Sequence, residues 1–335
     1  MSSHFLGNSI KLENVYISST GTTCGPLEFS GPLGAYFDKG YDDYHCGEKS
    51  FEKAERKMLR DSLDICLKRE KLKPKDIDLF IGGDLMNQNT TVHYLARELP
   101  QPFIGIYGAC SSFCLSMAIS SLMIEAGFVD QVVAMVSSHN ATAERQYRYP
   151  VEYGVQKKAT PPFTATGAIS TLLTNKPSSV RVEALTLGKV IDYSQDDPND
   201  MGRAMAPAAY DTIMTHFQDL KRSFKDYDLV VTGDLSTYGH KILKEMMQRN
   251  KIDVVRYNDC GCLLYDIQQQ EVFQGGSGCA CSGLVTMGYL YPLLKEKKYK
   301  RVLIVATGAL LSPMMSAQKD TIPSVAHAIS LEVVE

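Results

Sequence analysis

The stretch Tyr107-Gly108-Ala109-Cys110-Ser111-Ser112 follows an apolar run, residues 103–107, and opens a long segment of small and apolar residues, 113–123. This pattern predicts a turn at the end of a strand that leads into a buried helix, with Cys110 at the helix N-terminus. Unpaired N–H groups and the helix dipole favour a thiolate or a bound anion there, and they can lower the pKa of a cysteine. A lone cysteine is more often a buried structural residue, so both interpretations stay open.

The same stretch occurs twice, because Ala109-Cys110-Ser111 is echoed by Ala280-Cys281-Ser282 ahead of a second apolar segment. Strands alternating with helices in two copies predict an α/β chain of two parallel-rich halves, 1–176 and 177–335, related by a pseudo-twofold axis. Ligand sites are then expected at the C-terminal ends of strands, where the halves face each other. Three further echoes support the repeat: residues 78–85 match 228–235, 132–138 match 302–308, and 168–170 match 328–330.

Composition excludes several classes of protein. The chain has 44% hydrophobic and 22% charged residues, as expected for a soluble globule with a packed core. Its formal charge of −3 leaves no basic excess to neutralise phosphates, so nucleic acid is not an expected partner. We expect no signal peptide or membrane span, and therefore nine cysteines that remain thiols. Cys260-x-Cys262 and Cys279-x-Cys281 are too closely spaced for a typical structural zinc site, and we expect neither a metal nor a cofactor.

A duplicated α/β chain with a cysteine at a central helix N-terminus resembles the thiolase superfamily, which includes the ketoacyl-ACP synthases. This resemblance implies a thiolase-like duplicated fold, with the two halves in a five-layered α-β-α-β-α arrangement. Six longer blocks are similar to one branch, the stage V sporulation protein AD (SpoVAD) family of spore-forming bacteria. The blocks are Gly31-Pro32-Leu33-Gly34, Asp84-Leu85-Met86-Asn87-Gln88-Asn89, residues 137–146, residues 201–209, Gly275-Gly276-Ser277-Gly278-Cys279-Ala280-Cys281, and residues 306–313.

Similarity to this branch implies a protein that binds pyridine-2,6-dicarboxylate (dipicolinate), either free or as its calcium chelate. It also implies action with the other, membrane-embedded SpoVA proteins in moving dipicolinate into the developing spore. Because we expect no membrane segment in the chain, we expect it to lie peripherally at the spore inner membrane through such partners. Thiolase relatives commonly dimerise, so a homodimer is a further expectation from the resemblance.

The chain lacks the full residue set of a condensing enzyme. Relatives of that kind use a cysteine nucleophile, a histidine from a strand end in the second half, and a further histidine or asparagine that polarises the thioester carbonyl. By strand matching, the first histidine position falls at Gly233-Asp234, and the asparagine position falls near Ser277-Gly278. An aspartate beside Cys110 would raise the pKa of the thiol, so we expect no catalysis. The alternative is an acyltransferase in which Cys110 accepts an acyl group, with His327 as its partner.

Dipicolinate is a flat dianion, so its site needs hydrogen-bond donors at both ends. Helix N-termini and glycine turns supply backbone donors, and two such clusters would face each other across the pseudo-twofold axis. His327, which the repeat aligns with Gly167, is the third donor in this hypothesis. The predicted ligand-binding residues are therefore Cys110, Ser111, Asp234, Ser277, Gly278, Gly308 and His327.

Asp84 and Asp234 end equivalent strands and complicate this hypothesis. In the pocket they would repel a free dianion but favour its calcium complex, because calcium takes oxygen ligands. The interpretation we favour is that each aspartate caps the turn or helix that follows it. In the loop after the first central strand, 138–153, His139 and Arg145 can line the same pocket or a dimer interface. The tyrosines of that loop fit either a partner surface or packing within the loop, and they are Tyr147, Tyr149 and Tyr153.

Overall fold

The computed structural model describes residues 5–147 and 159–334, and its central sheet follows a path of ten strands. The first five strands, from the edge inward, are β6 (Phe103–Gly105), β5 (Leu79–Gly83), β7 (Gln131–Ser138), β9 (Gly167–Thr174) and β3 (Tyr16–Cys24). The other five, in the same order, are β12 (Tyr257–Asp259), β11 (Leu229–Thr232), β14 (Arg301–Ala309), β15 (Ser324–Val333) and β10 (Val180–Thr186). The two groups join where Tyr16 pairs with Arg181. Short strands complete the fold: β1 (Phe5–Leu6), β2 (Ser9–Lys11), β4 (Lys39–Gly40), β8 (Phe163–Thr164) and β13 (Gly276–Ser277).

The strand registers confirm two of the sequence echoes and correct the third. β5 and β7 pair in the same register as β11 and β14, as the offsets of 150 and 170 residues predict. In the first half Val136 pairs with Ile169, whereas in the second half Ala306 pairs with His327. His327 therefore takes the place of Ile169, and its alignment with Gly167 was wrong by two residues. A match of only three residues does not fix a register, since a shift of two keeps every side chain on its own face.

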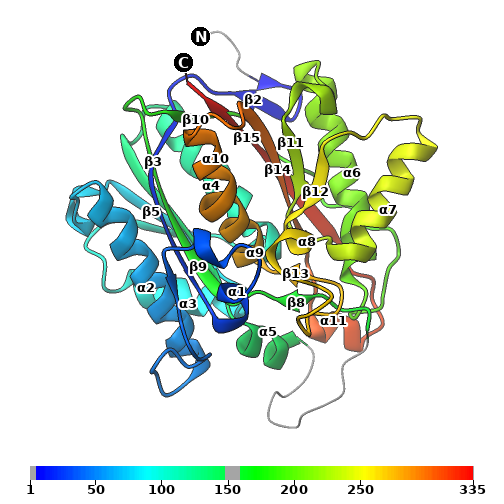
Figure 1. Cartoon of the computed structure of the whole chain (residues 1–335), viewed down its shortest axis with the longest axis horizontal. Helices are drawn as coiled ribbons and strands as arrows, with labels where there is room; N and C mark the ends of the chain where they lie inside the picture. The colour runs from blue at the N-terminus through cyan, green and yellow to red at the C-terminus, as the bar shows by residue number, and fades with distance from the viewer. Residues whose placement is uncertain (1–4, 148–158, 335) are drawn as a thin grey trace.

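Helices cover both faces of each group of strands, so the molecule has five layers (Figure 1). The outer layers are α2 (Phe51–Arg69) with α3 (Thr90–Ala96), and α6 (Met201–Leu220) with α7 (Ser236–Arg249). The middle layer contains α4 (Ser112–Glu125), α9 (Cys279–Gly283), the π-helical segment Leu284–Leu290 and α10 (Tyr291–Lys295). The predicted duplicated α/β fold with layers α-β-α-β-α is confirmed.

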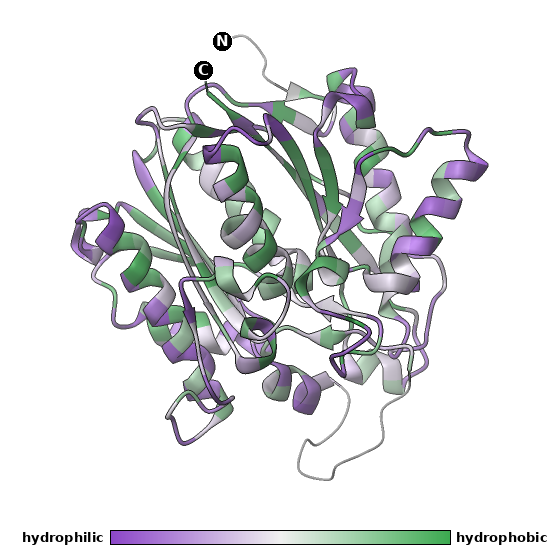
Figure 2. Ribbon diagram, viewed as in Figure 1, coloured by the Kyte–Doolittle hydropathy of each residue, from purple (hydrophilic) through white to green (hydrophobic). Residues whose placement is uncertain are grey.

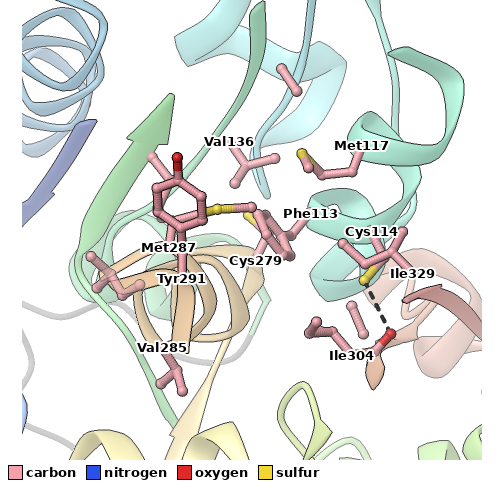
Figure 3. Close-up of a cluster of buried hydrophobic side chains, with 14 of the residues drawn as sticks. Phe113, Cys114, Met117, Val136, Cys279, Val285, Met287, Tyr291, Ile304 and Ile329 are labelled. Atoms are coloured by element: carbon pink, nitrogen blue, oxygen red, sulfur yellow. Dashed lines mark hydrogen bonds between the residues drawn. The ribbon is translucent and has the colours of Figure 1, made fainter. Parts of the chain in front are cut away.

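The middle layer is apolar on all sides because sheets pack against it from both directions. Figure 2 shows the hydrophobic residues concentrated on α4, α10 and the neighbouring strands. Some polar groups on α4 are satisfied within the helix: Ser116 Oγ donates to Phe113 O at 2.8 Å. The Cys114 thiol donates to Ile304 O of β14 at 3.7 Å, and Figure 3 shows both beside Phe113. A β-carbon at Gly283 would lie 3.2 Å from the Phe113 ring, so the central helices pack at close range.

Short helices and turns gather at the end of the molecule where the parallel strands terminate (Figure 1). β7 leads directly into α5 (Asn140–Tyr147), and β14 leads into α11 (Pro313–Ala317). The 3₁₀ turn η4 (Ala109–Ser111) lies at the same end, and it contacts β14 of the other half. This end also carries α1 (Pro26–Phe29) and α8 (Cys260–Leu264). The functional blocks predicted from the sequence meet here because both halves direct their strand ends to it.

A buried carboxyl group links the two halves near this end. Glu28 of α1 is fully buried, and its Oε1 accepts hydrogen bonds from Thr166 N at 2.9 Å and from the Tyr265 hydroxyl after α8. No described residue donates a hydrogen bond to its other oxygen, Oε2. Burial raises the pKa of Glu28 from 4.5 to about 7, so the folded protein holds this proton at pH values where the unfolded chain has lost it.

The protonation of Glu28 gives a pH dependence of stability with a defined sign. Between about pH 4.5 and 7 the folded state binds more protons at this group, so its contribution to the free energy of unfolding falls by about 3 kcal/mol as the pH rises. Glu28→Gln removes the titrating group, and we expect it to reduce the loss of stability between pH 5 and 8 by that amount. Urea unfolding at both pH values measures this. An unchanged difference between the two pH values would contradict the assignment.

Candidate functional site

The turn η4 holds Cys110 in a fixed and strained backbone. Ala109 has a φ of +49°, in the left-handed region that a non-glycine residue adopts only under constraint. Two hydroxyls stabilise the turn: Ser111 Oγ donates to Gly108 O at 2.6 Å, and Ser112 Oγ donates to Ala109 O at 2.7 Å. Cys110 is buried immediately before α4. The predicted turn between a strand and a buried helix is confirmed.

Gly308 of β14 reaches this turn from the second half. A β-carbon at Gly308 would lie 2.3 Å from Gly108 O and 3.1 Å from Ser111 N, so only glycine allows the strand to approach so closely. The structure thereby brings Gly308, Ser111 and Cys110 together, as the sequence predicted.

Asp234, at the end of β11, is the centre of a buried hydrogen-bond cluster. Its Oδ2 accepts from Ser277 Oγ and from Gly278 N, each at 3.0 Å, and its Oδ1 accepts from Thr307 Oγ1 at 2.5 Å. Cys110 Sγ lies 3.8 Å from Ser277 Oγ, one of these donors, and so joins the cluster. Six of the seven predicted ligand-binding residues thus form one group. Thr307 was not predicted, although the offset of 170 residues aligns it with Ser137.

The capping interpretation is confirmed for Asp84 and wrong for Asp234. Asp84 accepts from Met86 N at 2.8 Å and from Val92 N at 2.9 Å, so it caps the turn and the helix after β5. In the second half Asp259 of β12 performs this role instead, since it accepts from the backbone N–H groups of residues 235 and 236, each at 2.9 Å. The side chain of Asp234 is therefore free to face Cys110.

The structure does not bring His327 to this group. Its Nδ1 accepts a hydrogen bond from Gly188 N at 3.2 Å, and it does not line the cavity beside Cys110. Burial lowers the pKa of His327 to about 4, so the ring is neutral at pH 7. The sequence placed this residue two positions from its true register, and this error explains why it was expected at the site.

The other loop candidates have separate roles. His139 Nε2 lies 2.8 Å from Tyr44 O, and Arg145 forms an ion pair with Glu52 on α2. Tyr147 does reach the site, where its hydroxyl lies 2.7 Å from the Tyr107 hydroxyl. The remaining two candidates, Tyr149 and Tyr153, lie outside the described residues.

A cavity of about 30 Å³ lies beside Cys110. This volume holds about two water molecules. The described residues that line it carry no basic side chain, and most of them are apolar. They are Leu85, Tyr107, Ala109, Cys110, Ala143, Tyr147, Thr164, Met201, Ser277, Ala309 and Leu311. Sequence reasoning missed most of the apolar members, since they come from five separate segments that only the fold brings together.

Electrostatics keep the thiol protonated. Burial and then the charge of Asp234 raise the pKa of Cys110 well above its usual range. The lowering expected from a helix N-terminus is therefore wrong, while the effect expected from a neighbouring aspartate is confirmed. Burial also raises the pKa of Asp234, against the effect of its hydrogen-bond donors. A neutral thiol beside a carboxyl group is a hydrogen-bond donor rather than a nucleophile.

Comparison with known sequences shows the family of this chain. The family model described as stage V sporulation protein AD matches residues 8–332. The chain belongs to the stage V sporulation protein AD family. Stage V sporulation protein AD of Bacillus subtilis is 48% identical over 319 residues, which cover 95% of this chain and 94% of that protein.

Solved structures show that this SpoVAD chain has a thiolase-like fold. Similar ones include 3-oxoacyl-(acyl-carrier-protein) synthase III of Aquifex aeolicus, with a TM-score of 0.58, 14% identity, and coverage of 95% of this chain and 99% of the other. OleA of Xanthomonas campestris gives a TM-score of 0.59 at 14% identity, with 96% and 99% coverage. At such low identity the likeness shows the fold alone.

No helix in the described part of the SpoVAD chain combines the length and the apolar character needed to cross a bilayer. Among the same residues, no three or more histidine, cysteine or acidic side chains lie close enough to hold a metal ion. Membrane contact and calcium binding are therefore parts of the proposed function only.

The reactivity of Cys110 tests the electrostatic description of the site. We expect Cys110 to react with iodoacetamide at pH 8 far more slowly than a free cysteine. Asp234→Asn removes the negative charge at constant shape, and each pKa unit recovered raises the thiolate fraction about tenfold. Mass spectrometry of the Cys110 peptide measures the rate. Asp84→Asn is the matched control, because Asp84 is equally buried but caps α3. Equal rates in the Asp234→Asn variant and the parent protein, both folded, would contradict the description.

Proposed function

We propose that this chain is a non-catalytic binding protein for dipicolinate or its calcium chelate. It would act with SpoVA membrane proteins in moving this compound into the developing spore and lie at the inner membrane through them. The observation that carries the non-catalytic part is the buried Asp234 beside Cys110. It stands at the position where strand matching places the histidine of a condensing enzyme. Membership of the SpoVAD family supports the role in sporulation, and the identity of the ligand rests on the resemblance set out above.

The charge of the site favours the calcium chelate over the free dianion. The lining residues supply no cation, and Asp234 contributes a carboxyl group, so a free dianion would be desolvated without compensation. One calcium ion neutralises both carboxylates of dipicolinate, and calcium accepts further oxygen ligands such as a hydroxyl or a carboxylate. Ser277, Thr307 and Asp234 carry oxygens of this kind within the cluster. The proposal therefore includes stronger binding in the presence of calcium.

The cavity must widen before it admits such a ligand. Its volume of about 30 Å³ is roughly a tenth of the smallest ordinary ligand pocket. The hydrogen-bonded hydroxyls of Tyr107 and Tyr147 close one side, and the Tyr147 hydroxyl also donates to Leu85 O. Tyr107 is 44% exposed, so this pair lies at the mouth of the cavity. Separation of the two rings is the movement that would open the site.

Acyl transfer to Cys110 is the alternative function, and the site supports it less well. The retained cysteine and the apolar lining would suit an acyl chain. However, a thioester forms through the thiolate, and Asp234 disfavours the thiolate. The expected partner His327 hydrogen-bonds with Gly188 instead. Incubation with acyl-CoA followed by intact-mass measurement would reveal an acyl adduct, and its formation would favour this alternative.

Calorimetric titration with dipicolinate, with and without calcium, tests the proposed function. We expect saturable binding that is stronger with calcium and that discriminates against pyridine-3,5-dicarboxylate. Ala143→Leu adds three carbon atoms to the wall of a cavity that holds only two waters, so we expect it to weaken binding more than about tenfold. Ala141→Leu is the matched control, because Ala141 lies on the same helix, is similarly buried and does not line the cavity.

The possible outcomes distinguish a wrong binding site from a wrong ligand. Equal affinity in the Ala143→Leu variant and the parent protein would place dipicolinate elsewhere and overturn the cavity assignment. A complete lack of binding by the folded parent protein, with calcium present, would overturn the dipicolinate proposal itself. Thermal unfolding of each variant shows whether a loss of binding reflects a loss of structure.

A further inference from the structure

A second, larger cavity lies on the outer face of the first half, between the start of α2 and α3 (Figure 1 shows the two helices). Its volume is about 400 Å³, within the range of ordinary ligand pockets. α2 contributes Lys53 and Arg56 to its wall, and α3 with the residue that follows it contributes Thr91, Tyr94 and Arg97. The function proposed for the Cys110 cavity makes no use of these residues.

Among the described residues, the three cations of this cavity have no carboxylate partner. Within the described part of the chain, no carboxylate oxygen lies within 4 Å of the charged groups of Lys53, Arg56 or Arg97. Their neighbours differ: Arg60, one turn along α2, pairs with Glu98. Glu52 is the only acidic residue in the lining, and it pairs with Arg145.

The resulting charge is local and opposite to that of the whole molecule. Three cations and one paired carboxylate give the lining a formal charge of +2 (3 − 1 = 2), whereas the chain carries −3. Mutual repulsion of three unpaired cations around one hollow is unfavourable unless an anion enters it. The lining of the Cys110 cavity, by contrast, carries no basic side chain.

Tyr94 gives the cavity an aromatic wall and orients one of the cations. Its ring is 51% exposed, and the Arg97 guanidinium lies 4.9 Å from the ring centroid. Stacking of this kind restricts the arginine and leaves its N–H groups available for an acceptor. Arg56 is half-buried on the opposite wall, so two guanidinium groups and a lysine face the same space from two helices.

We propose that the cavity between α2 and α3 is a binding site for a small organic dianion whose charge lies on carboxylate or phosphate oxygens, held by Arg56, Arg97 and Lys53. Guanidinium groups bind carboxylates and phosphates in the same bidentate manner, so an aromatic dicarboxylate and a phosphate ester share the required chemistry. Its position, lining and charge distinguish it from the cavity beside Cys110. The inference does not depend on the function proposed for that cavity.

Calorimetric titrations test this site with three probes: benzene-1,3-dicarboxylate, phenyl phosphate and inorganic phosphate. The Ala143→Leu variant serves as the parent, because its Cys110 cavity is filled and the remaining heat reports other sites. We expect at least one organic probe to bind at 50 mM NaCl and to bind at least about fivefold more weakly at 300 mM, because the charges are solvent-accessible. The relative affinities of dicarboxylate and phosphate ester show which oxyanion the site prefers.

Arg56→Ala with Arg97→Ala should weaken this binding more than about tenfold. Arg60→Ala is the matched control, because it removes an arginine of the same helix that is already paired with Glu98. Should the double variant be unfolded by circular dichroism, Arg56→Gln and Arg97→Gln are tested singly and each should weaken binding. Affinity within twofold of the parent in a folded variant, or an equal loss in Arg60→Ala, would overturn the proposal. Binding of none of the three probes would overturn it as well.

Discussion

The buried carboxyl group of Asp234 is the constraint on which the site depends. It lies at the end of β11 and accepts hydrogen bonds from β13 and β14, and it contacts the thiol that the first half supplies. A buried carboxyl group needs such donors, because without them its desolvation is uncompensated. The positions of Ser277, Gly278 and Thr307 are therefore coupled to one another. The close approach of the two halves at Cys110 follows from the same cluster, together with the absence of a side chain at Gly308.

The duplication explains why the two halves are similar, and equivalent residues in the two halves have since taken different roles. Each half has a Gly-Asp-Leu sequence at the end of the equivalent strand, β5 or β11. Asp84 caps the helix that follows, as a short polar residue at that position commonly does. In the second half Asp259 of the neighbouring strand takes over the cap, so Asp234 contributes to the site. One local motif thus has two roles, and a residue 25 positions away decides between them.

This dependence on distant residues defines what the sequence could predict. Repeated strand and helix patterns are local, so they predicted the duplicated α/β chain and the turn around Cys110, whereas the five layers were implied by the resemblance to the thiolase superfamily. Ser277 and Gly308 were also predicted, because the strand ends of a duplicated fold converge. The register of β15 was not predictable from a match of three residues, and His327 was misplaced for that reason. The pKa of Cys110 was also wrong, since a helix N-terminus is visible in sequence, whereas burial and a carboxyl group from the other half are not.

The geometry around Cys110 resembles the geometry that nucleophilic catalysis requires. The charge of the neighbouring carboxyl group, however, opposes formation of the thiolate. A strained residue precedes the cysteine, a helix begins after it, and a glycine of the other half leaves room beside it. Such a turn fixes the thiol whether it reacts or only donates a hydrogen bond. The decisive difference is the group opposite: the positive charge of a protonated histidine stabilises a thiolate, and the negative charge of a carboxylate destabilises it. In a fold of this kind, substitution of a few charged residues can therefore replace covalent catalysis by ligand binding. The backbone that holds these residues need not change.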